Sequence, residues 1–197
     1  MKRLFDIVAS GLGLIVLSPL FLILAIWIKV DSKGPVFYRQ VRVGLHNRDF
    51  RIFKFRSMRV GADKGSLVTI GGRDPRITRS GYFIRKFKFD ELPQLINVFV
   101  GDMSLVGPRP EVRHYVDYWT DEQMHVLDVR PGITDPASIK FRNENELMEQ
   151  AEDPEKYYIE VIMQEKLKLY LEYVQNHSFL GDIGLIFKTF WVIVKER

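Results

Sequence analysis

The sequence predicts a mixed, mainly α-helical fold with one small β-hairpin, attached to a membrane through its N-terminal segment. Three observations support this fold class: an apolar run at the start, two adjacent stretches of strand-forming residues, and later segments with apolar residues at helical spacing. The chain of 197 residues is long enough for one domain with its own hydrophobic core. We therefore expect a membrane segment at residues 1–32 and a single folded domain at residues 33–197.

The N-terminal run extends from Leu4 to Val30 and contains few polar side chains. These are Asp6, Ser10, Ser18 and Lys29. A helix needs about 20 apolar residues to cross a bilayer, so the length of the run permits a full crossing. Ser18 and Pro19 lie in the middle of it, and a proline removes one helical hydrogen bond and kinks the helix. We expect Ser18 to donate to a backbone carbonyl that the proline leaves free.

Basic residues flank this segment on both sides: Lys2 and Arg3 precede it, and Lys29 and Lys33 end it. Because basic residues favour the cytoplasmic side of a membrane, both ends are expected to lie there. Two interpretations remain open on these residues. One is a re-entrant helix that breaks at Ser18 and Pro19 and returns to the same face, and the other is a kinked spanning helix.

A β-hairpin is expected next. Residues 35–43 and 49–56 are rich in β-branched and aromatic side chains, and Gly44-Leu45-His46-Asn47 between them is a turn signal. Alternation in the second strand places Lys54 and Arg56 on one face and Phe53 and Phe55 on the other. The polar, glycine-rich stretch from Gly61 to Ser80 is expected to be a loop, and long loops of this kind are often functional.

A helix with a polar start follows this loop. Apolar residues recur at helical spacing over residues 92–99, and Gly101 suits the helix end. Asp90 suits the N-cap position, and Pro93 is acceptable in the first turn. An N-cap carboxylate faces the positive end of the helix dipole, which would keep Asp90 ionised.

The remaining chain is predicted to be helical in several pieces. Short helices are expected at residues 112–119 and 121–129, and a longer amphipathic helix at residues 155–174. Residues 179–194 combine bulky apolar side chains with flanking cations, which is typical of a helix lying in the plane of a membrane interface. An ordinary C-terminal core helix is the alternative.

Composition excludes several function classes. The chain has no cysteine, which excludes disulfides, thiolate metal sites and a cysteine nucleophile. Its four histidines are scattered, and no phosphate-binding glycine loop is present. The stretch from Lys33 to Arg59 contains many basic residues and only one acidic residue, Asp49, which favours phosphate or anionic lipid as a partner. A solvated basic surface is the alternative. No nucleic-acid-binding signature is present, so nucleic acid is not an expected partner.

Asp90 and Glu91 are the strongest candidates for chemistry. A carboxylate can attack phosphorus and form an acyl phosphate, and Mg²⁺ commonly neutralises the charge of the phosphates through one or two carboxylates. A simple helix cap is the alternative interpretation of the pair. Arg109 stands between Pro108 and Pro110, which restrict its backbone and present the guanidinium as a phosphate ligand.

Four motifs together carry a family resemblance. Residues 54–58 read Lys-Phe-Arg-Ser-Met, and residues 90–98 read Asp-Glu-Leu-Pro-Gln-Leu-Ile-Asn-Val. Residues 101–110 read Gly-Asp-Met-Ser-Leu-Val-Gly-Pro-Arg-Pro, and residues 130–134 read Arg-Pro-Gly-Ile-Thr. In order and spacing, most of residues 1–143 resemble the bacterial sugar transferases, which are monotopic phosphoglycosyl transferases.

The resemblance implies a reaction. Asp90 would take the phosphosugar from a UDP-sugar and release UMP, and undecaprenyl phosphate or another polyprenol phosphate would then accept it. Glu91 and Mg²⁺ would assist, and either carboxylate of the pair could hold the metal. By motif position, further residues correspond to substrate-binding or site-lining positions. These are Lys54, Arg85, Arg109, Arg142 and Asp182.

The resemblance also implies a location. The N-terminal segment would be re-entrant with its break at Ser18 and Pro19, and amphipathic helices would seat residues 33–197 on the cytoplasmic face of the bacterial inner membrane, in contact with its lipid. The product would start glycoconjugate or polysaccharide synthesis. A homodimer through the domain that follows the membrane segment is left open.

One departure from the family pattern concerns the sugar. Many relatives have a glutamine where this chain has Ser138, and if this loop belongs to the sugar pocket, a sugar different from that of the best-known relatives is expected. The sequence itself names neither the sugar nor the pathway. Two alternatives to the transferase remain on the residues alone. A membrane-anchored scaffold would not need Asp90, and a Mg²⁺-dependent lipid phosphatase would release inorganic phosphate in place of UMP.

Overall fold

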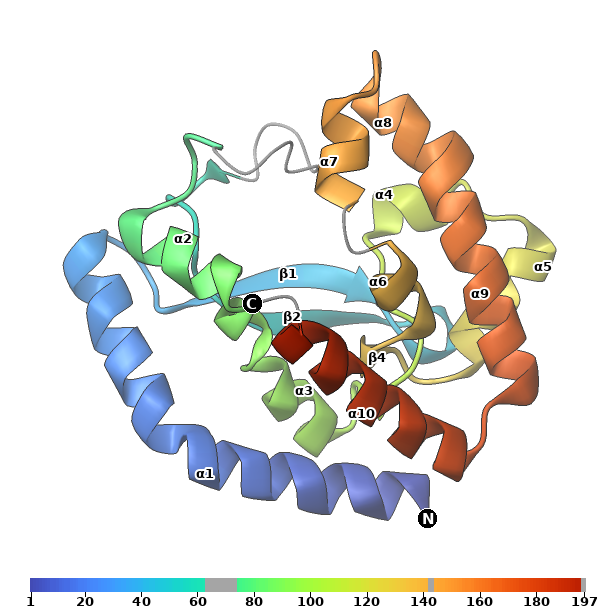
Figure 1. Ribbon diagram of the computed structural model, residues 1–197, viewed down its shortest axis with the longest axis horizontal. Coiled ribbons are helices and arrows are strands. Elements are labelled where there is room, and N and C mark those ends of the chain that lie inside the picture. Colours follow the sequence, from blue (N-terminus) through green and yellow to red (C-terminus); the bar gives the residue numbers. More distant parts are fainter. Residues whose placement is uncertain (63–73, 142–143, 196–197) are drawn as a thin grey trace.

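The computed structural model describes residues 1–62, 74–141 and 144–195. It is mainly helical, as predicted, with two small two-stranded sheets. Figure 1 shows the long helix α1 (Lys2–Asp31) along the lower and left edges, the β-hairpin in the middle, and α9 (Met163–Asn176) on the opposite side. The predicted loop at residues 61–80 lies largely outside the described residues.

Helix α1 passes through Pro19 without ending, and Figure 1 shows it bending midway along its length. Pro19 has no N–H to donate to the carbonyl of Ile15, four residues earlier. The Ser18 hydroxyl donates to that carbonyl at 2.8 Å, which confirms the predicted role of Ser18. The break is therefore a kink inside one continuous helix.

The two ends of α1 are fixed to the rest of the fold by polar contacts. At its start, the buried Asp6 carboxylate accepts a hydrogen bond from the Leu105 backbone N–H at 3.0 Å. At its end, Asp31 accepts from the backbone and hydroxyl of Ser80, both at 2.8 Å. Arg56 is buried and donates to the Ser32 carbonyl at 2.8 Å, so it caps α1 and does not join Lys54 on a basic face.

Between these ends α1 is long and apolar enough to cross a membrane, and only 11% of its most apolar stretch is buried within the protein. A large exposed apolar surface of this kind marks an interaction with lipid or protein.

The hairpin is confirmed. Strands β1 (Phe37–Val43) and β2 (Asp49–Phe55) pair antiparallel around a short 3₁₀ turn, η1 (Leu45–Asn47). His46 and Asn47 adopt positive φ angles of 53° and 59°, as the tight turn requires. Phe55 packs with Leu24 and Ile28 of α1, which joins the hairpin to the N-terminal helix.

The segment around Asp90 differs from the prediction. Helix α2 (Arg79–Lys86) is followed by the 3₁₀ turn η3 (Phe89–Glu91) and then by α3 (Gln94–Val100). The cap position of η3 is Lys88, in the left-handed region at φ 57°, and α3 begins after Pro93, so the prediction of Asp90 as N-cap is wrong. The Glu91 N–H donates to the Lys88 carbonyl, and the Leu92 N–H donates to the Phe89 carbonyl. This three-residue spacing is that of a 3₁₀ turn, and Asp90 lies inside it.

A second, parallel strand pair was not predicted. Strands β3 (Ser104–Val106) and β4 (Gly132–Thr134) pair parallel, and each is only three residues long. Of the helical segments between them, the one predicted at residues 112–119 is shorter than predicted, whereas the one predicted at residues 121–129 is present as an α-helical turn followed by a 3₁₀ turn. These elements are α4 (Arg113–Val116), α5 (Asp121–Met124) and η4 (His125–Asp128).

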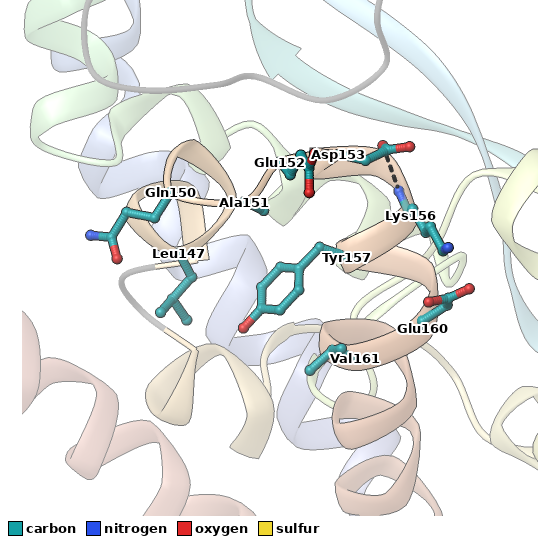
Figure 2. Close-up of a pocket in the computed structure, with 9 residues that line it drawn as sticks. All are labelled: Leu147, Gln150, Ala151, Glu152, Asp153, Lys156, Tyr157, Glu160 and Val161. Atoms are coloured by element: carbon teal, nitrogen blue, oxygen red, sulfur yellow. Dashed lines mark hydrogen bonds between the residues drawn. The ribbon is translucent and has the colours of Figure 1, made fainter.

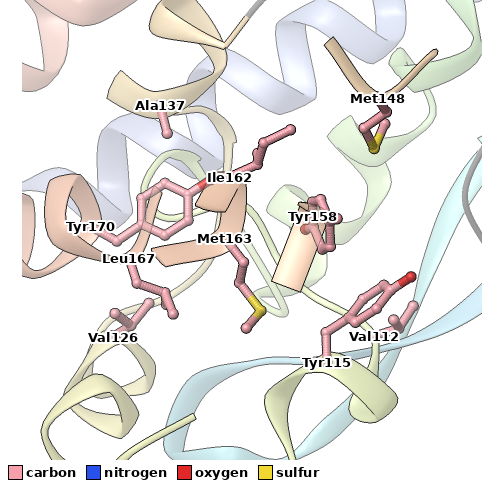
Figure 3. Packing of buried hydrophobic residues seen from close by; sticks show 10 residues of the cluster. All are labelled: Val112, Tyr115, Val126, Ala137, Met148, Tyr158, Ile162, Met163, Leu167 and Tyr170. Atoms are coloured by element: carbon pink, nitrogen blue, oxygen red, sulfur yellow. The ribbon is translucent and has the colours of Figure 1, made fainter. Parts of the chain in front are cut away.

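After β4 the chain is helical. The predicted helix at residues 155–174 is α8 (Pro154–Tyr157), a π-helical turn η5 (Tyr158–Ile162) and α9 in succession, and α6 (Pro136–Lys140) and α7 (Glu144–Glu149) precede them. Tyr158, Ile162, Met163 and Leu167 from this run form the largest core cluster with Tyr115 of α4, and Figure 3 shows these side chains converging. Trp191 and Phe187 of α10 (Phe179–Lys195) are 67% and 70% exposed, which argues against the alternative of a buried core helix.

Candidate active site

The site begins with a contact between the hairpin and η3. Strand β2 lies against η3 and α3, and the Lys54 Nζ atom donates to Glu91 Oε1 at 3.0 Å. Asn97 of α3 fixes this arrangement, because its side-chain oxygen accepts from the Phe53 N–H at 2.8 Å and its amide donates to the Arg51 carbonyl at 2.9 Å. Asn97 is completely buried. The predicted residues Lys54 and Glu91 are therefore brought together by a third, unpredicted residue.

Arg109 completes a clamp on the same carboxylate. Its guanidinium donates to both oxygens of Glu91, with Nη1 at 3.2 Å from Oε2 and Nη2 in closer contact with Oε1. Such a two-pronged pair fixes the orientation of both side chains. Lys54 and Arg109, which are distant in sequence, thus hold Glu91 from two sides.

The parallel strands place Arg109. The Gly107 N–H donates to the Thr134 carbonyl at 3.0 Å, and the Gly132 N–H donates to the Pro108 carbonyl at 2.8 Å. A Cβ atom on Gly107 would lie 2.3 Å from the carbonyl oxygen of Arg130, so only glycine permits this approach. Gly107 therefore permits the close contact between the two strands, and this contact positions Arg109 next to Glu91.

The charges of this cluster act strongly on one another. Burial alone raises the pKa of Glu91, but the positive charges of Arg109 and Lys54 outweigh it and hold that pKa well below its usual range. Burial lowers the pKa of Lys54, while Glu91 opposes this shift. The charge of Glu91 raises the pKa of Arg109. Glu91 is therefore an ionised carboxylate with a fixed geometry.

Asp90 lies in a different environment although it is the neighbouring residue. Burial raises the pKa of Asp90, and the negative charge of Glu91 raises it further. The positive charges of Lys54, Arg85 and Lys88 act in the opposite direction. Asp90 Oδ1 is buried and accepts no hydrogen bond from the part of the chain that the structure describes. Two adjacent carboxylates with opposite pKa shifts are a common arrangement in active sites.

The pair fits a magnesium ion in its donor chemistry. Mg²⁺ binds carboxylate oxygens and typically takes the rest of its ligands from water and substrate phosphates. The unpartnered oxygen of Asp90 is available for such a bond, and Glu91 is held ionised beside it. Among the described residues no cluster of three or more acidic or histidine side chains surrounds a single point, so a metal here would depend on substrate oxygens.

One predicted site residue lies away from the clamp, and another lies outside the described residues. Asp182, near the start of α10, is buried and accepts from the Tyr173 hydroxyl at 2.7 Å and from Lys2, so it joins α10, α9 and α1. No contact connects it with the clamp on Glu91 among the described side chains. Arg142 lies outside the described residues.

Sequence reasoning missed two buried polar residues, Asp135 and Gln94. Asp135 is completely buried, and its charge acts on Arg109. Its carboxylate caps α6 by accepting from the Ser138 backbone N–H at 2.7 Å and from the Ser138 hydroxyl, so Ser138 supports Asp135. Gln94 is 1% exposed, and its Nε2 atom has no partner among the described residues. An aspartate directly before a proline is a helix-start signal that could have revealed Asp135.

The structure also contains a pocket that is separate from the clamp. It has a volume of about 660 Å³ and lies between α7 and the α8–η5 segment. Figure 2 shows three carboxylates on it, those of Glu152, Asp153 and Glu160. It contains none of the predicted site residues, and its negative charge does not suit a phosphate substrate.

Comparison with known proteins gives a consistent result. The chain is 40% identical over 196 residues to a UDP-N-acetylgalactosamine-undecaprenyl-phosphate N-acetylgalactosaminephosphotransferase of Aeromonas hydrophila, covering 98% of this chain and 43% of the relative. It is 38% identical to a UDP-glucose:undecaprenyl-phosphate glucose-1-phosphate transferase of Klebsiella pneumoniae, covering 95% of this chain and 39% of the relative. The uncharacterized sugar transferase EpsL of Bacillus subtilis is 37% identical, with 96% of this chain and 85% of the relative covered.

The chain spans about two fifths of the length of the first two of these relatives, 43% and 39%. The match nevertheless includes the clamp and its neighbours, because it extends over almost the whole chain. The sequence model of the bacterial sugar transferase family matches residues 1–196. The chain therefore belongs to the bacterial sugar transferase family.

Proposed function

We propose that this protein transfers a sugar 1-phosphate from a UDP-sugar to undecaprenyl phosphate and releases UMP. The names of the relatives support both substrates, since each specifies a UDP-sugar and undecaprenyl phosphate. The observation that carries the proposal is Asp90, a buried carboxylate with one unpartnered oxygen next to the clamped Glu91. An unpartnered buried oxygen is costly unless a ligand uses it.

In the first step, Asp90 attacks the phosphorus that carries the sugar. A bond forms between its carboxylate oxygen and that phosphorus, the bond to the bridging oxygen breaks, and UMP leaves with the electron pair. The product is an acyl phosphate between Asp90 and the sugar phosphate. Asp90 must be ionised to attack, so its raised pKa makes the rate fall as pH falls through that pKa.

In the second step, a phosphate oxygen of undecaprenyl phosphate attacks the same phosphorus. The new phosphorus–oxygen bond forms as the bond to Asp90 breaks, which regenerates the carboxylate and yields a polyprenyl diphosphosugar. The two half-reactions use one nucleophile in turn, which predicts ping-pong kinetics.

Asp90 and Glu91 would hold Mg²⁺ together with the diphosphate oxygens, and the ion would neutralise phosphate charge. Lys54 and Arg109 keep Glu91 ionised and in place, and Arg109 is also within reach of an anion bound there. Arg85 adds positive charge near Asp90. Substrate-binding roles for Arg142 and Asp182 remain predictions from the family resemblance.

The substrates require a membrane location. A water-soluble UDP-sugar and a lipid phosphate must meet Asp90, and α1 supplies an exposed apolar segment beside the domain. We propose that α1 is re-entrant at its Pro19 kink, with both ends on the cytoplasmic face of the inner membrane, and that α10 lies in the interface. The exposed aromatic residues of α10 support this position.

The test measures UMP release from purified protein in nanodiscs, with Mg²⁺, undecaprenyl phosphate and a series of UDP-sugars. Asp90→Asn removes the nucleophile while keeping its size, and Asp128→Asn is a matched control at an exposed carboxylate. We expect release to vanish in the first variant and to persist in the second. Release that Asp90→Asn leaves unchanged would exclude Asp90 as nucleophile, and release of inorganic phosphate in place of UMP would indicate a lipid phosphatase. A protein that binds membranes but turns over no UDP-sugar would be a scaffold.

A further inference from the structure

A row of aromatic rings leads from the membrane helix to the catalytic pair. Trp27 of α1 contacts Phe83 of α2 at 5.2 Å between ring centroids, and Phe83 contacts Phe87 at 4.5 Å and Phe89 at 6.2 Å. Phe87 and Phe89 are stacked at 5.6 Å. We call these four residues the aromatic row. Phe89 is the residue immediately before Asp90, so the row ends at the nucleophile.

The row connects the core with the surface, because Phe89 packs against the core cluster of Leu24, Ile28, Phe55 and Ile84 whereas the other end of the row is exposed. Trp27 remains 39% exposed and Phe83 41% exposed, and the neighbouring Tyr82 is also 41% exposed. Phe87 and Phe89 are half-buried. Figure 1 shows α2 beside the C-terminal half of α1, where this surface lies. Exposed apolar surface that continues from a membrane-length helix suits an apolar ligand.

Positive charge accompanies the row. Lys86 lies over the ring of Phe87 at 5.9 Å, and the charges of Arg85 and Lys88 act on Asp90. The surface is thus apolar at the α1 end and cationic at the Asp90 end. This polarity matches a molecule with a long hydrocarbon chain and a terminal phosphate.

We propose that the aromatic row binds the first isoprene units of the polyprenol phosphate acceptor and directs its phosphate to Asp90. The inference rests on the proposed function, because it assigns a place to one of the two substrates. The row extends over four rings and begins on α1, which a single stacked nucleobase of the UDP-sugar would neither require nor reach. An ordinary membrane lipid is the other possible occupant, and the experiment separates the two.

The experiment compares the two half-reactions in Phe83→Ala and Trp27→Ala. Exchange of labelled UMP into UDP-sugar needs only the first half-reaction and no acceptor, so it reports both correct folding and donor binding. Losing one ring contact with a ligand should raise the KM for undecaprenyl phosphate about tenfold. The exchange rate and the KM for the UDP-sugar should stay within about twofold of wild type. Tyr118→Ala, at an exposed tyrosine on another part of the surface, should change none of these values.

Chain length and membrane binding complete the test. With a short acceptor such as geranyl phosphate, the KM for the acceptor should rise less in the same variants, because fewer isoprene units contact the row. An unchanged KM for undecaprenyl phosphate would overturn the proposal, and so would an equal rise in the KM for the UDP-sugar. Weaker sedimentation of the variants with acceptor-free phosphatidylglycerol vesicles would assign the row to membrane attachment. If exchange itself does not require Asp90, the proposed function fails, independently of the aromatic row.

Discussion

Replacing Arg109 with methionine tests the clamp on Glu91 most directly through stability. Arg109→Met removes the two-pronged pair but keeps an unbranched apolar side chain of similar reach. Removing one partner of a buried ion pair costs about 3–5 kcal/mol. The side chains of Arg109 and Glu91 keep 32% and 19% exposure, and Lys54 still contacts Glu91. Solvent screening therefore reduces the expected loss to about 2 kcal/mol.

The assay is thermal unfolding of the purified protein in detergent at pH 7. In a domain of this size each kcal/mol shifts Tm by about 2–4 °C, so we expect a fall of about 4–8 °C. Arg113→Met is the matched control, because the pair of Arg113 with Asp49 is exposed, and its loss should change Tm by less than about 2 °C. In the triple variant Lys54→Met/Arg109→Met/Glu91→Gln, part of the lost stability should return, because none of the three paired charges then stays buried without a partner.

The pH dependence of this difference has a definite sign. The folded-state pKa of Glu91 lies well below the ordinary value of 4.5. The ion pair therefore adds its full contribution to the free energy of unfolding above pH 4.5, and this contribution is lost as pH falls through the folded-state pKa. The difference in Tm between wild type and Arg109→Met should be largest at pH 7 and should become smaller in acid. A single variant as stable as wild type at pH 7, or a triple variant no more stable than the single one, would refute the clamp.

Three further predictions concern the frame of the site. Gly107→Ala should prevent the close approach of β3 and β4 and abolish UMP release. Gly184→Ala should leave UMP release unchanged, because a Cβ atom there meets nothing within 4 Å. Equal activity of the two variants would contradict the role of Gly107 in strand packing. Asn97→Leu should lower the free energy of unfolding by about 2–4 kcal/mol, measured by urea titration, since two backbone groups of β2 lose their partner. Asp90→Asn should not lower Tm, because burial disfavours the charge that it removes, and a clear fall would count against the raised pKa of Asp90.

The local elements could be predicted from the sequence because their signals are local. Strand-forming residues on either side of Gly44–Asn47 specify the hairpin, and Pro19 with Ser18 specifies both the kink of α1 and the hydrogen bond that compensates it. The Asp90 cap could not be predicted correctly. A cap position and a 3₁₀ turn before Pro93 share the same residue preferences, and only the tertiary packing selects the turn.

The clamp illustrates what sequence periodicity does not contain. The motifs and the family resemblance identified Lys54, Glu91 and Arg109 individually, but their contacts connect β2, η3 and the segment after β3. The parallel pair β3–β4 that positions Arg109 has only three residues in each strand, too few for an alternating pattern to be recognised. The raised pKa of Asp90 likewise follows from burial and the charge of Glu91, and the lowered pKa of Glu91 follows from Arg109 and Lys54, which are distant in sequence.

The central claim is that Asp90 forms a covalent bond to the sugar phosphate, and intact-protein mass spectrometry tests it most directly. Wild-type protein would be incubated with its UDP-sugar and Mg²⁺ in the absence of undecaprenyl phosphate and then denatured in acid. We predict a mass increase equal to one phosphosugar, located on the peptide that contains Asp90, absent from Asp90→Asn and lost when the acceptor is added. UMP release in the presence of acceptor, with no adduct at any time and no effect of Asp90→Asn, would contradict the account.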